Sequence, residues 1–365
     1  MSADSPTGAL SAGLVSGRTV RELASGIDAL YLSGQVDLDE SLLADLDRAR
    51  ESARAVSESV PYRLGKAEFG LAPYGWGRYP FRLSHEYGLI GLSGSEHLPA
   101  VRVQPRAEML HGLGPEATVD AFSDVLLSVG EVRWSVSRVD LFADVQGWWP
   151  TVEDRDRFVC RATTRDTFEE SGELTGFQFG RRKRRGLSAR VYDKSEQMRK
   201  TGTEWWRDVW GDTYGEGDPV ARIEFEFGRK VLRECGVDSP DDVFENTAGL
   251  WGYATEWLSY RDRSGDGTRS RWPVSAEWET IRTLSLRERA VTVERTTGSR
   301  QAAAEKRITA GLCGYLSSFA ALRNIETLGE SLSTAESVLR VWELETGIPF
   351  SERVARKRRE WEWGL

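Results

Sequence analysis

The sequence predicts an α+β fold: a curved, antiparallel-rich sheet of two similar halves, flanked by helices and followed by an all-helical C-terminal domain. Three observations lead to this prediction. Several segments between residues 132 and 227 alternate charged and apolar side chains, as strands do. Short, glycine-punctuated strand patterns fill the region 61–106, and helical spacing dominates beyond Pro273.

The first third of the chain predicts a strand, a helix and a meander. Residues 26–35 (GIDALYLSGQ) have the composition of a strand. The acids of residues 37–40 suit the first turn of a helix that extends to about Ala55. The meander that follows is predicted from strands at 61–72, 78–84, 87–93 and 100–106.

The middle of the chain predicts alternating helices and strands. Residues 115–129 have helical spacing, 132–146 form a strand, and Thr151 begins a helix that ends near Ala162. A hairpin is expected around the basic loop 181–186. The remaining elements are hairpin strands at 176–180 and 187–192, a helix at 194–210, a strand at 220–227 and a helix at 229–235.

Composition shifts predict the domain boundaries. Residues 1–16 form a flexible tail, 17–262 a catalytic domain, 263–274 a polar linker and 275–365 a helical domain. Helices are expected there at 275–290, 298–322, 330–345 and 350–362. A faint duplication, in which Ile27-Asp28 echoes Val139-Asp140, indicates the two similar halves, with coincidence as the competing explanation.

Charge and cysteine content exclude several classes of protein. The 365 residues carry a formal net charge of −8, so nucleic-acid binding would depend on local basic patches such as 181–185 and 356–359. The cysteines Cys160, Cys235 and Cys313 form no CxxC pair, which argues against a zinc ribbon and predicts a reducing, cytoplasmic location. Neither a secretory signal nor a segment of transmembrane length is present, so no membrane association is expected.

Strand periodicity predicts one charged site. Every second side chain of a strand shares a face. The segments 137–144, 190–196 and 221–227 are each predicted to have one apolar face and one charged face. If the three strands are neighbours in register, their charged faces merge. The residues on that face are Arg138, Asp140, Phe142 and Asp144; Arg190, Tyr192 and Lys194; and Arg222, Glu224 and Glu226.

These residue types suit the cleavage of a phosphodiester bond. Tyr192 is the candidate nucleophile, and a nearby cation from Arg190 or Lys194 favours its phenolate. Hard divalent cations prefer oxygen ligands, so a Mg²⁺ or Mn²⁺ ion is expected on Asp140, Asp144, Glu224 and Glu226. The candidate DNA contacts are Arg138, Arg222, Arg181, Arg182, Lys183, Arg184 and Arg185.

Structural explanations compete with this site. Tyr192 has the residue type of a cross-strand packing aromatic, and Asp140 and Glu224 each follow an arginine by two residues, as in Arg–carboxylate ladders across strands. Other catalytic patterns are absent: the three histidines are dispersed, and no GxxxxGK[ST] loop occurs. Histidine-held metal chemistry and ATPase activity are therefore not expected.

At the segments SRVDLFADVQG, FQFGRRKRRGLSARVYDKSEQ and VARIEFEFGRKVLRECG the sequence resembles the trans-acting replication initiators of rolling-circle plasmids and related phage replication initiation factors. The resemblance covers about residues 20–280. It implies that Tyr192 nicks DNA through a 5′-phosphotyrosyl intermediate and frees a 3′-hydroxyl, while Asp140, Glu224 and Glu226 hold the divalent metal.

Two classes of function follow from the resemblance. The first is an endonuclease that starts rolling-circle replication of a plasmid or phage. Its partners would be an origin duplex or hairpin that is single-stranded at the nick, a helicase and a second copy of the chain. The second is a non-catalytic DNA-binding protein of the same fold, a recombinase activator or regulator. The combination of Tyr192, Asp140 and Glu224 favours the enzyme.

Overall fold

A computed structural model describes most of the chain, which divides into two compact units, Met1–Arg295 and Thr296–Leu365. The described residues are 19–182, 186–284, 286, 312, 316–317, 319–347 and 349–355. The predicted tail 1–16, the basic residues Lys183, Arg184 and Arg185, and the 356–359 run lie outside them.

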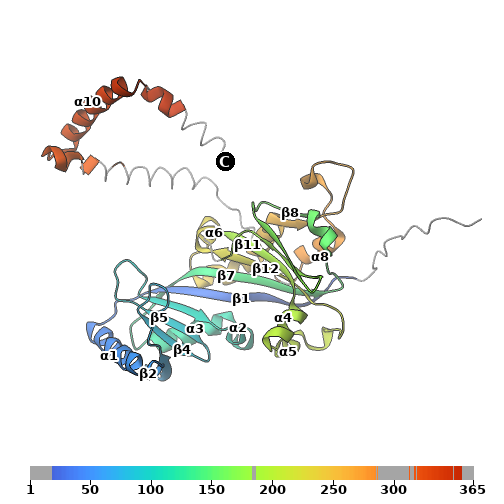
Figure 1. The fold of residues 1–365 in the computed structure, drawn as a ribbon. Helices are drawn as coiled ribbons and strands as arrows, with labels where there is room; N and C mark the ends of the chain where they lie inside the picture. The colour runs from blue at the N-terminus through green and yellow to red at the C-terminus, as the bar shows by residue number, and fades with distance from the viewer. Residues whose placement is uncertain are drawn as a thin grey trace, which may run out of the picture. The chain divides into compact units, whose positions relative to one another are not determined.

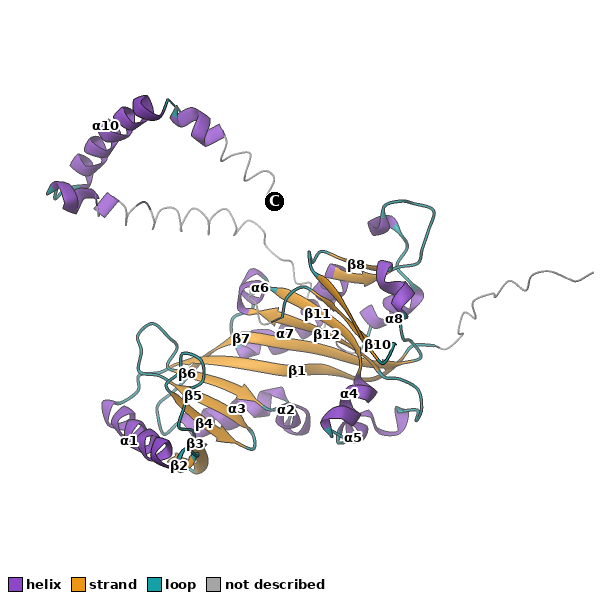
Figure 2. Cartoon of the chain, in the orientation of Figure 1, coloured by secondary structure: helices purple, strands orange, loops and turns teal. Residues whose placement is uncertain are grey.

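An 11-stranded sheet dominates the first unit, and all of its neighbouring strands are antiparallel (Figures 1 and 2). Its strand order is β2-β3-β4-β5-β6-β1-β7-β12-β11-β10-β9. The strands are β1 (Arg21–Gln35), β2 (Val60–Leu64), β3 (Ala67–Leu71), β4 (Phe81–His85), β5 (Gly88–Leu92), β6 (Val101–Pro105), β7 (Arg133–Gln146), β9 (Arg165–Glu170), β10 (Glu173–Phe179), β11 (Leu187–Asp193) and β12 (Ala221–Gly228).

The strand order confirms two similar halves. The long strands β1 and β7 pair with each other at the centre. Each also pairs with the last sheet strand of its own half, β1 with β6 and β7 with β12, and the earlier strands then continue outward. The α+β fold class is therefore confirmed.

Helices cover both halves of the sheet (Figure 2). The acid-rich start of α1 is explained by Asp39, whose side chain accepts a hydrogen bond from the Ser41 backbone N–H at 2.9 Å. The described helices of the first unit are α1 (Glu40–Val56), α2 (Ala107–Leu113), α3 (Pro115–Leu126), α4 (Lys194–Thr201), α5 (Trp206–Trp210), α6 (Arg229–Glu234), α7 (Pro240–Trp257) and α8 (Ala276–Arg282). Helix α10 (Leu328–Thr346) belongs to the second unit. Short 3₁₀ turns are η1 (Val152–Asp156), η2 (Gly211–Thr213) and η3 (Arg269–Arg271).

Two local predictions fail. The helix expected from Thr151 to Ala162 is instead η1 followed by β8 (Phe158–Cys160), because β8 pairs with the distant β13 (Leu258–Tyr260). The helix expected over 194–210 is broken into α4 and α5, since Gly202 adopts a left-handed conformation with φ of 67° and ends α4.

The boundary between the two units follows Arg295, which is C-terminal to the segment 263–274 that was predicted as a linker. In α8, the Trp278 side chain is fully buried and its indole N–H donates to the Thr255 carbonyl of α7 at 3.1 Å. The Trp251 indole N–H donates in turn to the Ile281 carbonyl at 3.0 Å. These reciprocal hydrogen bonds and the apolar contacts around them place α8 in the first unit.

Apolar side chains lie on both faces of the central strands. The main core includes Leu141 and Phe225, and Phe225 packs edge-on against Trp251 of α7. A smaller cluster on the opposite face contains Phe142 and Trp206. No helix in the described part of the chain combines the length and the apolar character needed to span a bilayer.

Candidate active site

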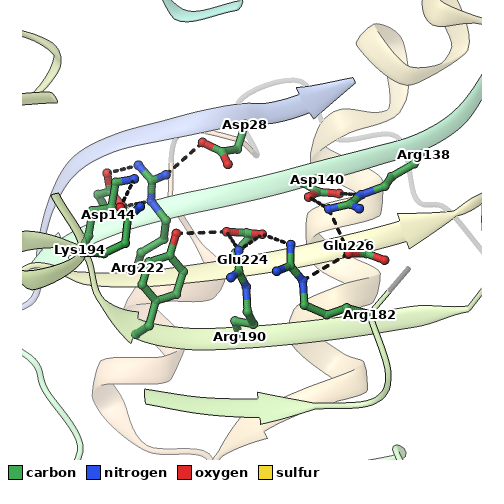
Figure 3. Close-up of polar contacts among 12 residues, drawn as sticks. Asp28, Arg138, Asp140, Asp144, Arg182, Arg190, Lys194, Arg222, Glu224 and Glu226 are labelled. Atoms are coloured by element: carbon green, nitrogen blue, oxygen red, sulfur yellow. Dashed lines mark hydrogen bonds and ion pairs between the residues drawn. The ribbon is translucent and has the colours of Figure 1, made fainter. Parts of the chain in front are cut away.

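The predicted charged faces merge in the structure. The register sets Tyr192 of β11 opposite Arg222 of β12, which in turn lies opposite Asp144 of β7. The next row on the same face joins Arg190, Glu224 and Phe142, and the row after it joins Ser188, Glu226 and Asp140. Figure 3 shows the charged members of these rows, Asp140, Asp144, Arg190, Arg222, Glu224 and Glu226, together along the strands. Period-two alternation in three neighbouring strands is therefore sufficient to bring the predicted residues together.

Tyr192 is held against a carboxylate. Its hydroxyl donates to Glu224 Oε2 at 3.1 Å. The Arg190 Nη2 atom donates to Glu224 Oε1 at 2.5 Å and to Oε2 at 2.7 Å, and its guanidinium lies 4.8 Å from the centroid of the Tyr192 ring. Burial, reinforced by the Glu224 charge, holds the pKa of the Tyr192 phenol well above its usual range. The phenol is therefore protonated at neutral pH, and the carboxylate that accepts its hydrogen bond is placed to take its proton.

Tyr192 lines a cleft of about 630 Å³ together with Arg190, Lys194 and Asp28. Lys194 begins α4; its ammonium donates to Gln197 Oε1 at 2.8 Å and lies 4.5 Å from the Trp206 ring centroid. Burial and the neighbouring Arg222 charge lower the pKa of Lys194 to about 8. A second cation therefore stands beside the tyrosine, and its charge depends on pH in the physiological range.

Arg222 lies at the buried end of the site and does not line the cleft. Its side chain is fully buried. The Nε and Nη2 atoms each donate to Asp144 at 2.6 Å, Nη1 donates to Asp28 at 2.9 Å, and the Trp210 indole N–H donates to Asp144 at 2.8 Å. Its guanidinium lies 3.9 Å from the Trp206 ring centroid. In this arrangement Arg222 holds three strands together, and its predicted contact with DNA stays a prediction.

Asp28 is a site residue that the sequence pattern did not single out. It falls at a register shift of β1, between Ile27 and Ala29, where an unpaired residue is re-aimed. Its carboxylate pairs with Arg222 and lies 3.5 Å from His111 Nε2. Burial opposes ionisation, but the charge of Arg222 and the neighbouring His111 hold the pKa of Asp28 far below its usual range. No local sequence motif marks the bulge in β1. The position of Asp28 in the site therefore follows from the pairing of the strands and not from its own sequence neighbours.

The remaining predicted metal ligands are bound by arginines. Arg138 Nε donates to Asp140 Oδ1 at 2.7 Å, and Arg138 Nη2 lies 2.9 Å from Glu226 Oε2. Arg182 lies 3.4 Å from Glu226 and 3.7 Å from Glu224. Burial and the nearby Glu224 charge raise the pKa of Asp140 to about 7. Like Arg222, Arg138 is paired with carboxylates in this arrangement, and its predicted contact with DNA stays a prediction.

These carboxylates do not fit a Mg²⁺ or Mn²⁺ ion in the arrangement described. Asp140 and Asp144 are four residues apart along one strand, about 13 Å, so one ion cannot bind both. Asp144 already accepts from Arg222 and Trp210, and Glu224 from Arg190 and Tyr192. Among the residues that the structure describes, no three His, Cys, Asp or Glu side chains are arranged to hold a metal. The Arg–carboxylate ladder considered from the sequence is therefore present.

Of the basic loop, Arg181 is exposed and Arg182 is engaged by the carboxylates, while Lys183, Arg184 and Arg185 lie beyond the described residues. Their predicted contact with DNA stays a prediction. Arg190 and Lys194 are the predicted basic residues that line the cleft.

No family model matches the chain, but it is similar to a phage protein and to a solved structure. The chain is 25% identical over 292 residues to the uncharacterized protein ORF430 of Pseudomonas phage Pf1. The match spans 67% of this chain and 65% of the phage protein, so less than two thirds of that relative is covered. Among solved structures, the chain is similar to a rolling circle replication initiator protein from Geobacillus stearothermophilus, with a TM-score of 0.46, 14% sequence identity, and coverage of 74% of this chain and 98% of that one.

Proposed function

We propose that this chain nicks one strand of DNA at a replication origin and starts rolling-circle replication. One observation carries the proposal: Tyr192 lines a cleft that Arg190 and Lys194 also line, and its hydroxyl donates to the buried carboxylate of Glu224. A candidate nucleophile and two cations therefore share one concave site, and a proton acceptor is bonded to the nucleophile. The resemblance of the surrounding segments to rolling-circle initiators supports the same reaction.

The proposed step is an in-line displacement at phosphorus. Tyr192 Oη forms a bond to the phosphorus atom as its proton passes to Glu224, and the bond between phosphorus and the 3′ oxygen breaks. The 3′ oxygen takes up a proton and leaves as a hydroxyl, while the protein keeps the 5′ end as a phosphotyrosine. Arg190 and Lys194 neutralise charge on the non-bridging oxygens.

The wild-type protein tests the proposal through the position of the label. The origin strand is labelled at its 5′ or its 3′ end, incubated with protein in Mn²⁺ or EDTA, and resolved on a denaturing gel. We expect a protein-linked band only with the 3′ label, and a free 5′-labelled product that a polymerase extends. A protein-linked band with the 5′ label would contradict the proposed chemistry. A divalent ion would enter the carboxylate cluster only if arginines moved onto DNA phosphates, and the EDTA lane tests that step.

A non-catalytic DNA-binding function is the second candidate. The complete pairing of Asp144, Asp140 and Glu224 with arginines favours it, because this network also serves as a rigid support for a sheet. The same gel separates the two functions. A clear binding shift on native gels without any covalent band from the cognate origin would establish the second.

The lowered pKa of Lys194 predicts how DNA binding depends on pH. A lysine is charged below its pKa, and the pKa of Lys194 is lowered to about 8, so this cation is lost as the pH rises through that value. Between pH 7 and pH 9 we expect the salt dependence of single-strand binding to weaken by about 0.7 in log–log slope, one phosphate contact. Fluorescence anisotropy with a NaCl titration measures this slope. Lys194→Arg is the control, since it keeps its charge; equal changes in both proteins would remove Lys194 from the phosphate contacts.

Protein partners belong to the proposal as well. In α10, Leu339, Val341 and Leu344 are 55%, 54% and 84% exposed. Such apolar exposure on one helix supports the binding of another protein, for which a helicase and a second copy of the chain are the proposed partners. The plasmid or phage setting and the cytoplasmic location are proposals of the same kind.

A further inference from the structure

Three residues in a row across the sheet form an unusual surface beside Tyr192. Gly176 of β10 pairs with Tyr192 of β11 on one side and with Phe168 of β9 on the other. Paired residues point to the same face, so two aromatic side chains flank a position that has none. All three residues line the cleft.

A glycine is required at position 176 because there is no room for a side chain. Backbone conformation is not the reason, since the φ angle of Gly176 lies outside the left-handed region that favours glycine. A Cβ atom at this position would lie 2.7 Å from the Val191 carbonyl oxygen and 2.9 Å from Tyr192 Cβ. Because Gly176 has no side chain, the space above its backbone between the Tyr192 and Phe168 positions is not filled from this strand.

Phe168 is unusually accessible for an aromatic residue on a strand. Its side chain is 48% exposed, and the register shift between Leu174 and Gly176 sets its position opposite the glycine. The backbones of β9 and β11 are two strand spacings apart, about 9.5 Å. A flat ring sandwiched between two others needs about 7 to 8 Å, two van der Waals contacts. A slot of this width accepts a planar aromatic group.

We propose that this slot between Tyr192 and Phe168 binds one unpaired nucleobase of the strand to be cut, next to the scissile phosphate. The inference rests on the proposed nicking function, and it names a substrate contact that the reaction itself does not require. The cations of Arg190 and Lys194 line the same cleft, so a phosphodiester at Tyr192 and its neighbouring base are accommodated together.

The test is a double-mutant cycle that combines a substitution in the protein with the removal of one base from the DNA and compares the changes in binding affinity. Binding of the fluorescent single strand is measured by anisotropy for wild type and Phe168→Ala, with an abasic nucleotide placed at each position in turn. We expect Phe168→Ala to weaken binding by about 5- to 100-fold, the value of one stacked base. One abasic position should weaken binding to wild type by a similar factor and cause a smaller loss in Phe168→Ala, where only the Tyr192 ring remains to stack on the base.

Two outcomes would overturn the slot: Phe168→Ala binding like wild type, or abasic losses that multiply fully with the substitution at every position. Tyr74→Ala is the matched control, because Tyr74 is 72% exposed and does not line the cleft. The covalent assay is independent of this cycle. Coupling without any covalent product would reject the nicking function and keep the base slot, while a covalent product without coupling would do the reverse.

Discussion

Replacement of Tyr192 by phenylalanine is expected to abolish the covalent protein–DNA product while DNA binding stays near the wild-type level. The substitution removes only the hydroxyl: the ring still packs under Arg190, and Glu224 keeps its hydrogen bonds to that arginine. Without the nucleophilic oxygen no phosphotyrosine forms, and we expect residual cleavage below about one part in 10⁴. A denaturing gel with the 3′-labelled origin strand measures the product, and anisotropy measures binding.

Tyr31→Phe provides the matched control for this prediction. The Tyr31 ring also lies under an arginine, 4.9 Å from the Arg138 guanidinium, and burial likewise raises the pKa of its phenol. The ring does not line the cleft, so Tyr31→Phe should nick at the wild-type rate. A covalent product that survives in Tyr192→Phe would move the nucleophile elsewhere, and its loss in Tyr31→Phe alone would point to Tyr31.

Replacement of Arg222 by methionine is expected to lower the free energy of unfolding by about 3 to 5 kcal/mol, the usual cost of breaking a buried ion pair. The substitution leaves the Asp144 carboxylate buried with the Trp210 N–H as its one remaining donor among the described residues, and it takes from Asp28 its 2.9 Å ion pair. Urea unfolding followed by tryptophan fluorescence measures the change as a shift of the midpoint.

The comparison with an exposed ion pair makes this second prediction specific. Arg48, paired with Asp45 at 2.9 Å, is 72% exposed, and Arg48→Met should change stability by less than about 1 kcal/mol. The double variant Arg222→Met, Asp144→Leu removes both buried charges, so it should lose less than the sum of the two single substitutions. An Arg222→Met protein as stable as wild type would mean that water reaches the Asp144 carboxylate.

The charged face was predictable because strand periodicity is a local property. Arg190, Tyr192 and Glu224 needed only alternation and antiparallel neighbours to meet on one side of the sheet. The sequence offered both a phosphate and a carboxylate ladder as partners of the arginines and could not decide between them, since an arginine on a strand suits either. Only burial distinguishes these uses, and burial of Arg222 depends on α5 and on a bulge in a strand almost 200 positions away.

Helix α7 differs from the arginines, because its sequence carries a clear local signal for the start of a helix. Helix α7 was not predicted, yet Ser239 and Asp242 form a capping box around Pro240 at its first position. By contrast, β8 had no local signal, because a three-residue strand is stabilised by its partner β13 and not by its own composition. Local chemistry therefore indicates helix ends, while short strands depend on long-range pairing.

The central pairing of β1 with β7 limits how the chain can be divided. The two strands are bonded along almost their entire length, and Arg222 of the second half pairs with Asp28 of the first. Separated copies of the two halves would each present a long, unpaired strand edge, which is a template for aggregation. The doubled sheet is thus an indivisible folding unit, and fragments cut at the symmetry boundary would serve neither as soluble modules nor as interchangeable parts in engineered fusions.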